Sequence, residues 1–169
     1  MTWHSPAARD DYFMGLALEA ALCAYELGEV PVGAVLVMND VVVGTGFNQP
    51  ITRQDPTAHA EVMALRAAGG ALQNYRLPQG ELFVTLEPCL MCAGAMMHAR
   101  LARIVYGASD AKTGVAGSVL NVFEHAQLNH HAQIINGVRA DEARQLLQRF
   151  FKERRAAHKN ATSNEPRLD

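Results

Sequence analysis

Residues 82–106 read LFVTLEPCLMCAGAMMHARLARIVY, and this stretch decides the class of the fold. The apolar run from Leu82 to Leu86 predicts a buried strand, which Pro88 ends. A helix is predicted to begin at Cys89 and to run to about His98, and Ile104–Tyr106 predicts a second short strand. A strand, a helix and another strand in succession are typical of an α/β protein.

The flanking sequence continues this alternation of helices and strands. Its predicted elements, in chain order, are a helix at 11–27 ended by Gly28, a hairpin at 32–46 that turns at Asn39–Asp40, a loop at 48–56, a helix from Pro56 to about Gly69–Gly70, a glycine-containing loop at 110–117, a weak strand at 133–136 and an amphipathic helix at about 141–157. We therefore expect a three-layer α/β/α architecture around a sheet of about five strands.

Length and composition restrict the class of protein. With 169 residues and 49% hydrophobic content, the chain is expected to form one globular domain at 1–158, followed by a disordered tail at 159–169. No apolar run reaches the length of about 18 residues that a membrane span needs, and the N-terminus lacks the pattern of a secretory signal. Three cysteines are too few and odd in number for a disulfide framework. These features predict a cytoplasmic protein.

Charge is unevenly distributed along the chain. The net charge of −2 argues mildly against a general nucleic-acid binder. Between Arg139 and Lys159, however, seven basic side chains face three acidic ones, a local balance of +4. Such a run fits an ordinary solvated helix face and equally a patch that holds phosphates. Charge alone leaves both interpretations open.

Two short motifs, His59-Ala60-Glu61 and Pro88-Cys89-Leu90-Met91-Cys92, carry the chemistry. Catalytic zinc sites use three protein ligands from nitrogen or sulfur and keep a fourth position for water. His59, Cys89 and Cys92 supply such a set, and Glu61 is left over as a proton carrier. The two motifs together are the signature of zinc nucleobase deaminases.

Alternatives to a catalytic zinc site remain at this level. Cys-x-x-Cys alone is also found in redox pairs and in closed structural zinc sites, which need a fourth ligand. Cys23 lies on the apolar side of the first helix and is expected in the core. The remaining histidines lack familiar ligand spacing; they are His4, His98, His125, His130, His131 and His158. Residues two positions apart on a helix are rotated by about 200° around its axis. The spacing of His59 and Glu61 therefore does not by itself bring their side chains together.

The chain resembles the bacterial tRNA adenosine deaminases of the cytidine-deaminase-like superfamily. The zinc motifs identify the superfamily, and other blocks within residues 29–155 narrow it to the tRNA enzymes. These blocks are EVPVGAVLV, GFNQPI, DPTAHAEVMALR, NYRL, VTLEPCLMCAGAMMHAR, YGASDAKTG and ADEARQLLQRFFKERR.

This resemblance implies a mixed central sheet, one zinc ion per subunit and a homodimer. It also implies hydrolytic deamination of the wobble adenosine of a tRNA anticodon to inosine, in which water activated by zinc attacks C6 and Glu61 moves the protons. The family pattern places Asn48, Asp110 and Lys112 in contact with the RNA. It places the basic last helix nearby, where one of Phe150 and Phe151 is expected to pack and the other to reach the substrate.

Two other functions remain open from the sequence. A deaminase of free nucleosides, nucleotides or bases would use the same zinc chemistry. A zinc or RNA-binding module without catalysis would need a fourth protein ligand and would have no use for Glu61.

Overall fold

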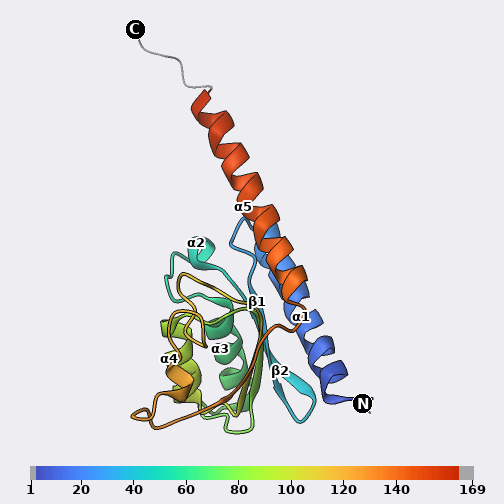
Figure 1. Ribbon diagram of the computed structural model, residues 1–169, viewed down its shortest axis with the longest axis vertical. Coiled ribbons are helices and arrows are strands. Elements are labelled where there is room, and N and C mark those ends of the chain that lie inside the picture. The colour runs from blue at the N-terminus through green and yellow to red at the C-terminus, as the bar shows by residue number, and fades with distance from the viewer. Residues whose placement is uncertain (1–2, 164–169) are drawn as a thin grey trace.

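A five-stranded sheet forms the centre of the structure, a computed structural model that describes residues 3–163 (Figure 1). The strand order is β2-β1-β3-β4-β5. The strands are β1 (Gly33–Met38), β2 (Val41–Phe47), β3 (Glu81–Leu86), β4 (Arg103–Ala108) and β5 (Gln133–Ile135). β1 is antiparallel to β2 and β3, whereas β3, β4 and β5 are parallel to one another. The predicted mixed sheet of about five strands is therefore confirmed.

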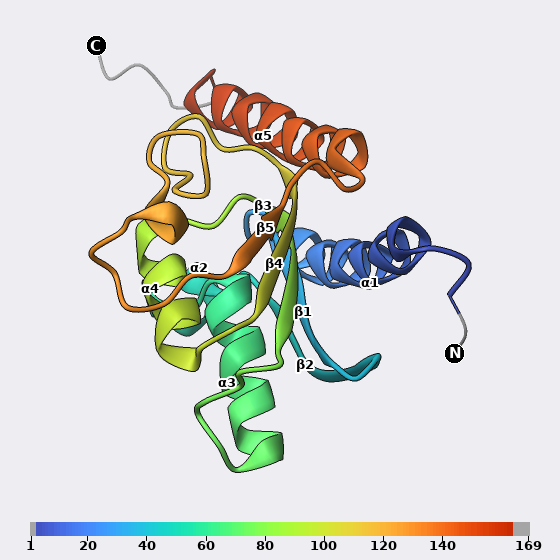
Figure 2. The same cartoon turned by 60° about the horizontal axis from the view of Figure 1, so that its bottom comes forward.

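Helices cover both faces of the sheet (Figure 2). α1 (Pro6–Glu26) and α5 (Ala140–Ser163) lie on one face, and α3 (Ala60–Leu72) and α4 (Leu90–Ala99) lie on the other. A short helix α2 (Pro50–Arg53) and a 3-10 turn η1 (Val122–Glu124) interrupt the loops. The predicted three-layer arrangement is thus confirmed. None of the described helices is both long and apolar enough to cross a membrane.

Alternate residues of the strands build the two cores, because successive side chains of a strand point to opposite faces. Leu36 packs in the core beneath α3 and α4, and its neighbour Val35 packs against α1. Helix α3 lies very close to β2, since a Cβ on Gly46 would stand 2.2 Å from the carbonyl oxygen of Ala60. This close contact fixes the start of α3 against the sheet.

The first helix begins earlier than its apolar spacing predicted. The hydroxyl of Ser5 accepts a hydrogen bond from the N–H of Ala8 at 3.1 Å, and Pro6 occupies the first turn. A serine cap followed by proline is a common start of a helix. The helix therefore begins at Pro6, more than one turn before residue 11.

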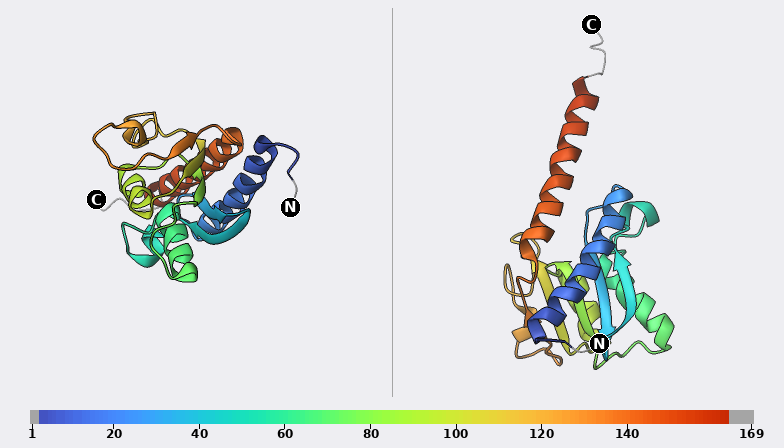
Figure 3. Two further views of the ribbon diagram at one scale, coloured as in Figure 1. Left: turned by 90° about the horizontal axis from the view of Figure 1, so that it is seen from below. Right: turned by 90° about the vertical axis from the view of Figure 1, so that its right-hand side faces the viewer.

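The last helix is longer than predicted. α5 continues through Ser163, so that residues 159–163 of the expected tail are helical, and residues 164–169 lie outside the described residues. The extension follows a run of alanine, arginine and lysine, which favour helix strongly. The outer part of α5 extends past the rest of the structure, as the right-hand view of Figure 3 shows. The single domain at 1–158 stays a prediction.

Candidate active site

The two zinc-motif segments meet at one edge of the sheet. β2 and β3 are both antiparallel to β1, so they run in the same direction, and the helices that follow them begin at the same edge. His59 and Cys89 are the N-cap residues of α3 and α4. Their backbones are extended, with φ/ψ of −74°/154° and −81°/171°. The predicted helix starts at Pro56 and Cys89 are corrected to Ala60 and Leu90.

This correction explains how His59 and Glu61 reach the same site. The rotation of about 200° applies only to residues inside a helix. His59 precedes the helix, because a turn held by Asp55 occupies the preceding residues: its carboxylate accepts hydrogen bonds from the N–H and the hydroxyl of Thr57, at 2.8 and 2.7 Å. The side chains of His59 and Glu61 therefore line one cavity.

Three side chains have the geometry of zinc ligands. Nδ1 of His59 lies 3.7 Å from Sγ of Cys89 and 3.6 Å from Sγ of Cys92. Tetrahedral zinc with ordinary Zn–N and Zn–S bonds separates these atoms by about 3.6 Å. Within residues 3–163, the cluster contains these three ligands and no fourth histidine, cysteine or carboxylate. It thus matches an open site and not a closed structural one.

The charges of the cluster also favour a cation. A hydrogen bond from Cys92, stronger in effect than burial, lowers the pKa of Cys89 to about 4. The same contact and burial raise the pKa of Cys92 far above its usual value. The polypeptide by itself therefore stabilises one thiolate, and a divalent cation would stabilise both. The donor set and its protonation fit zinc.

Glu61 is a buried acid beside this cluster, with 4% of its surface exposed. Burial is the main cause that raises the pKa of its carboxyl group. The cavity that Glu61 lines has a volume of about 250 Å³, and Asn48, Cys89 and Asp110 line it as well. A carboxyl group with a raised pKa, held next to a metal site and open to a cavity, can both take and return a proton.

Asn48 holds the start of α3 and faces the same cavity. Its Oδ1 accepts a hydrogen bond of 2.9 Å from the N–H of Ala60. His59 makes no side-chain cap, so Asn48 supplies the cap and leaves the imidazole for the metal. The NH₂ group of Asn48 can still donate to a ligand.

Asp110 and Lys112 lie on the loop that follows β4. The carboxylate of Asp110 accepts hydrogen bonds from the N–H of Lys112, at 2.9 Å, and from the hydroxyl of Thr113, at 2.6 Å. Burial alone would raise the pKa of Asp110, but these hydrogen bonds outweigh it and lower the pKa. Asp110 lines the cavity, whereas Lys112 is exposed on the loop beside it.

Two buried acids were not recognised in the sequence, one of which, Glu87, lines the cavity. Glu29 and Glu87 are each 2% exposed. Glu29 accepts hydrogen bonds from the N–H and the hydroxyl of Thr52 in α2, at 2.6 and 2.9 Å. Glu87 binds the loop that carries Asp110. An acid directly after a buried strand is costly unless it is hydrogen-bonded, and this position after Leu86 is the signal that could have identified Glu87.

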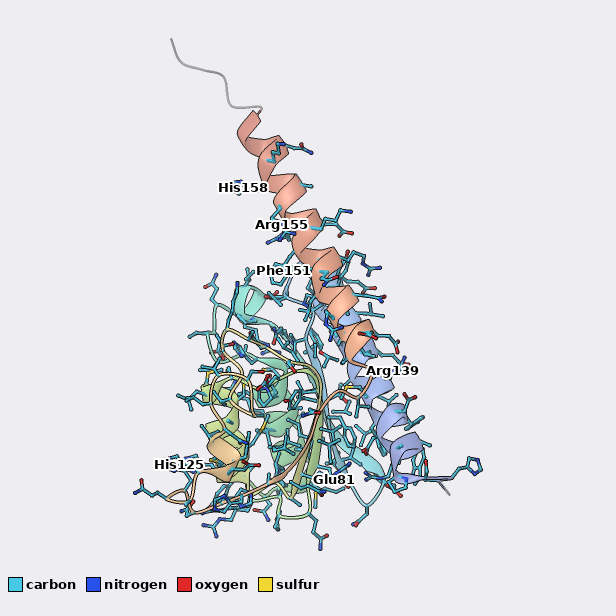
Figure 4. The ribbon with its side chains drawn as sticks, viewed as in Figure 1. Glu81, His125, Arg139, Phe151, Arg155 and His158 are labelled. Atoms are coloured by element: carbon cyan, nitrogen blue, oxygen red, sulfur yellow. The ribbon has the colours of Figure 1, made fainter. Side chains whose placement is uncertain are left out.

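The two phenylalanines of α5 have different environments. Phe150 is 6% exposed and packs against Tyr25, with ring centroids 5.8 Å apart. Phe151 is 43% exposed. It lies with Arg155 and His158 along the outer part of α5 (Figure 4). Phe150 therefore packs, as expected of one of the pair, and Phe151 is available at the surface.

Several of the basic side chains between Arg139 and Lys159 have partners. Arg139 and Arg144 each pair with an acid three residues away, and Arg149 lies 4.6 Å from the ring centre of Tyr25. Of these contacts, that of Arg149 with Tyr25 joins α5 to α1, whereas the other two join residues three positions apart on the same segment; farther along α5, Lys152 and Arg155 are exposed. The phosphate-binding interpretation of the basic run stays a prediction, and the exposed cations of α5 are the side chains to which it would apply.

The fold and the site match known deaminases. Residues 7–108 match the family described as the cytidine and deoxycytidylate deaminase zinc-binding region. A tRNA-specific adenosine deaminase of Haemophilus influenzae is 50% identical over 152 residues, which cover 89% of this chain and 87% of the relative. The corresponding protein of Bacillus subtilis is 40% identical and covers 92% of this chain and 97% of the relative.

Solved structures agree with these relatives. One chain, from studies of A-to-I editing by tRNA:A34 deaminases at the wobble position, has a TM-score of 0.78 and 41% identity, and the match covers 80% of this chain and 98% of that one. A guanine deaminase of Bacillus subtilis has a TM-score of 0.58 and 36% identity over 67% of this chain and 72% of that one. The chain therefore belongs to the zinc-binding cytidine and deoxycytidylate deaminase family and, within it, to the tRNA-specific adenosine deaminases.

Proposed function

We propose that this protein hydrolyses the wobble adenosine of a tRNA anticodon to inosine and releases ammonia. The observation that carries the proposal is the meeting of a three-ligand metal cluster and the buried acid Glu61 in one cavity. The names of the close relatives support adenosine in tRNA as the substrate. We place the reaction in the cytoplasm, where a tRNA substrate is available.

The ligands and the acid have separate roles. His59, Cys89 and Cys92 would hold one zinc ion per subunit, which lowers the pKa of a bound water and polarises it. Glu61 would accept a proton from the attacking water and deliver it to a ring nitrogen of adenine as the oxygen adds to C6. Glu61 would then carry the proton of the new C6 hydroxyl to the amino group, which leaves as ammonia while C6 becomes a carbonyl. One water is consumed and one ammonia is released for each inosine.

Several side chains are proposed to hold the RNA. Asn48 would donate its amide to the flipped nucleotide within the cavity. Asp110 and Lys112 would contact the substrate from the loop after β4. Phe151 and the exposed cations of the outer part of α5, such as Arg155, would stack on or attract the RNA, because exposed aromatic and basic side chains bind unpaired nucleotides.

The catalytic proposal is tested by Glu61→Gln. The glutamine has the same size but cannot carry a proton, so turnover should fall by about 10²–10⁴-fold. Zinc content should stay at one per chain, because Glu61 lies outside the ligand cluster. The assay would follow inosine in an anticodon stem-loop with a wobble adenosine. Undiminished turnover in the variant would eliminate Glu61 as the proton carrier.

The substrate proposal is tested by offering several substrates to the same wild-type enzyme. The stem-loop is offered beside free adenosine, cytidine and guanine, the last because guanine deaminases share the fold. Inosine in the RNA alone supports tRNA as the substrate. Turnover of cytidine or guanine, with the RNA untouched, would assign the protein to the deaminases of free nucleosides or bases.

We also propose a homodimer formed through the face of α3 and α4. An exposed, mostly apolar groove of about 650 Å³ lies there, between Val62 and Leu65 of α3 and Ala95 of α4. Tyr75 lines the groove and is 68% exposed. Tyr75→Glu should therefore produce monomers without unfolding the chain, which sedimentation can measure. A wild-type protein that sediments as a monomer at micromolar concentration would reject the proposal.

A further inference from the structure

Glu87 lies at the junction of a zinc-binding segment and the loop that carries Asp110. It follows β3 directly and precedes Pro88 and the ligand Cys89. Glu87 is 2% exposed, and its carboxylate lies against the segment from Asp110 to Ser118. Neither the metal cluster nor the proposed proton transfers use it.

All the hydrogen-bonding capacity of this carboxylate is used by the loop. Oε2 accepts from the N–H of Asp110 at 2.9 Å and from the hydroxyl of Ser118. Oε1 accepts from the N–H groups of Ala116 and Ser118, both at 3.0 Å. An ionised carboxylate offers about four lone-pair positions. One side chain therefore binds both ends of the loop and closes it into a ring.

The loop is shaped to approach this carboxylate closely. A Cβ on Gly114 would lie 2.4 Å from the carboxyl carbon of Glu87 and 2.6 Å from the carbonyl oxygen of Asp110. Any other residue at 114 would push the loop away. The N–H of Val115 also donates to the carbonyl oxygen of Pro88 at 3.0 Å, and Gly114 pairs with Cys89 as an isolated β-bridge. The loop is thus built around Glu87 and docked on the zinc-binding segment.

We infer that Glu87 is a positioning residue for substrate binding: it fixes the loop at 109–118 and so places Asp110 at the mouth of the cavity. The inference rests on the proposed contact of this loop with the RNA. Glu87 also lines the cavity, but the hydrogen bonds of its carboxylate go to the loop and it is not part of the ligand cluster in residues 3–163. Its loss should therefore reduce affinity for RNA and leave the chemical step almost intact. A role confined to folding or to zinc retention would instead reduce stability or metal content.

Glu87→Gln removes the charge and keeps the size. Whichever way the amide is turned, its NH₂ group faces two donors, so about half of the hydrogen bonds to the loop are lost. Ser118→Ala is a milder variant, because it removes one donor and leaves the three backbone N–H groups in place. Glu124→Gln is the matched control: this acid is exposed, six residues beyond the loop.

The experiment combines amide hydrogen exchange of the zinc-loaded protein with steady-state kinetics on an anticodon stem-loop. For Glu87→Gln we expect exchange within 110–118 to accelerate about tenfold or more, with α3 and α4 unchanged. KM should rise about tenfold, while kcat should change by less than about threefold. Ser118→Ala should show the same pattern more weakly, Glu124→Gln should match wild type, and zinc should stay at one per chain.

The outcomes separate this inference from the proposed function. Unchanged exchange at 110–118 in Glu87→Gln, or loss of zinc, or faster exchange throughout the protein, would overturn the positioning role. Faster exchange confined to 110–118 with an unchanged KM would support the role of Glu87 in shaping the loop, and would reject the proposed contact between this loop and the RNA.

Discussion

The two ends of the central sheet differ in how their acidic side chains are partnered. Where β3 and β4 begin, Arg103 donates to Asp10 and Glu81, and Arg9 donates to Glu81 and Asp40 (Glu81 is labelled in Figure 4). Every acid of this ion-pair cluster has a guanidinium partner. At the other end, where β3 and β4 finish, the cavity is lined by acids, a thiol and an imidazole, and no lysine or arginine is among its lining residues in the described chain.

This difference indicates that one end of the sheet contributes mainly to stability and the other mainly to function. In the ion-pair cluster two guanidinium groups face three carboxylates, each of which is paired, and these pairs hold the strands and α1 together. The end of the sheet that carries the site has acidic groups without cationic partners. Backbone N–H groups donate hydrogen bonds to one of them, Glu87, and a metal cation would neutralise charge on the thiolates. Perturbed acids and thiols in a cavity are typical of functional sites. The comparison predicts that changes at the two ends will affect different measurements.

Removal of zinc should have the largest effect, and only at the site end. A chelator should abolish turnover, and added zinc should restore it. Cys23 is exposed and not in the core, contrary to the prediction from the sequence. In the loaded protein it should therefore be the main thiol that reacts with a thiol reagent, whereas after chelation the half-buried Cys89 should react as well. Full activity in protein shown by metal analysis to lack zinc would contradict the metal role of the cluster.

Loss of a cation at the opposite end should reduce stability and spare catalysis. Arg103→Ala leaves Asp10, which is 6% exposed, without its close partner. Arg9 then remains as a more distant partner, 3.9 Å from Asp10, and breaking a buried pair costs about 3 kcal/mol of unfolding free energy. Urea unfolding should show this loss, while kcat/KM for the stem-loop at room temperature should match wild type. The double variant Arg103→Met with Asp10→Leu should recover much of the loss, since it buries no unpaired charge.

Acid should also affect the two ends at different pH values. The pKa of Asp40 is lowered, chiefly by the hydrogen bond from Arg9. A group with a lowered folded pKa contributes stability above its unfolded pKa of about 3.9 and loses it as the pH falls through the folded value. As the pH falls, protons also compete with the metal for thiolate and imidazole, and this competition begins at a higher pH than the titration of Asp40. As the pH is lowered, activity and bound zinc should therefore be lost before the far-UV circular dichroism changes. Loss of zinc and of secondary structure at the same pH would contradict this prediction.

The sequence predicted one end of the sheet far better than the other. The zinc motif lies in local spacing, so His59, Glu61, Cys89 and Cys92 can be named from the sequence alone. The ion-pair cluster joins Asp10 to Arg103, which are 93 positions apart, and no local pattern connects them. The position of His59 before the helix also depends on the turn at Asp55 and on the cap from Asn48, which lies 12 positions before Ala60.

The smallest effect is expected where the same ion-pair chemistry occurs on the surface. Arg144 pairs with Asp141 on α5, and their side chains are 54% and 82% exposed, against 17% and 8% for Arg103 and Asp10. Exposed pairs contribute about 0–1 kcal/mol, because water screens them and ordering two long side chains costs entropy. Arg144→Gln keeps helix propensity nearly constant, so urea unfolding should change by less than about 0.5 kcal/mol. A loss as large as that of Arg103→Ala would show that burial does not account for the stability contributed by the ion-pair cluster.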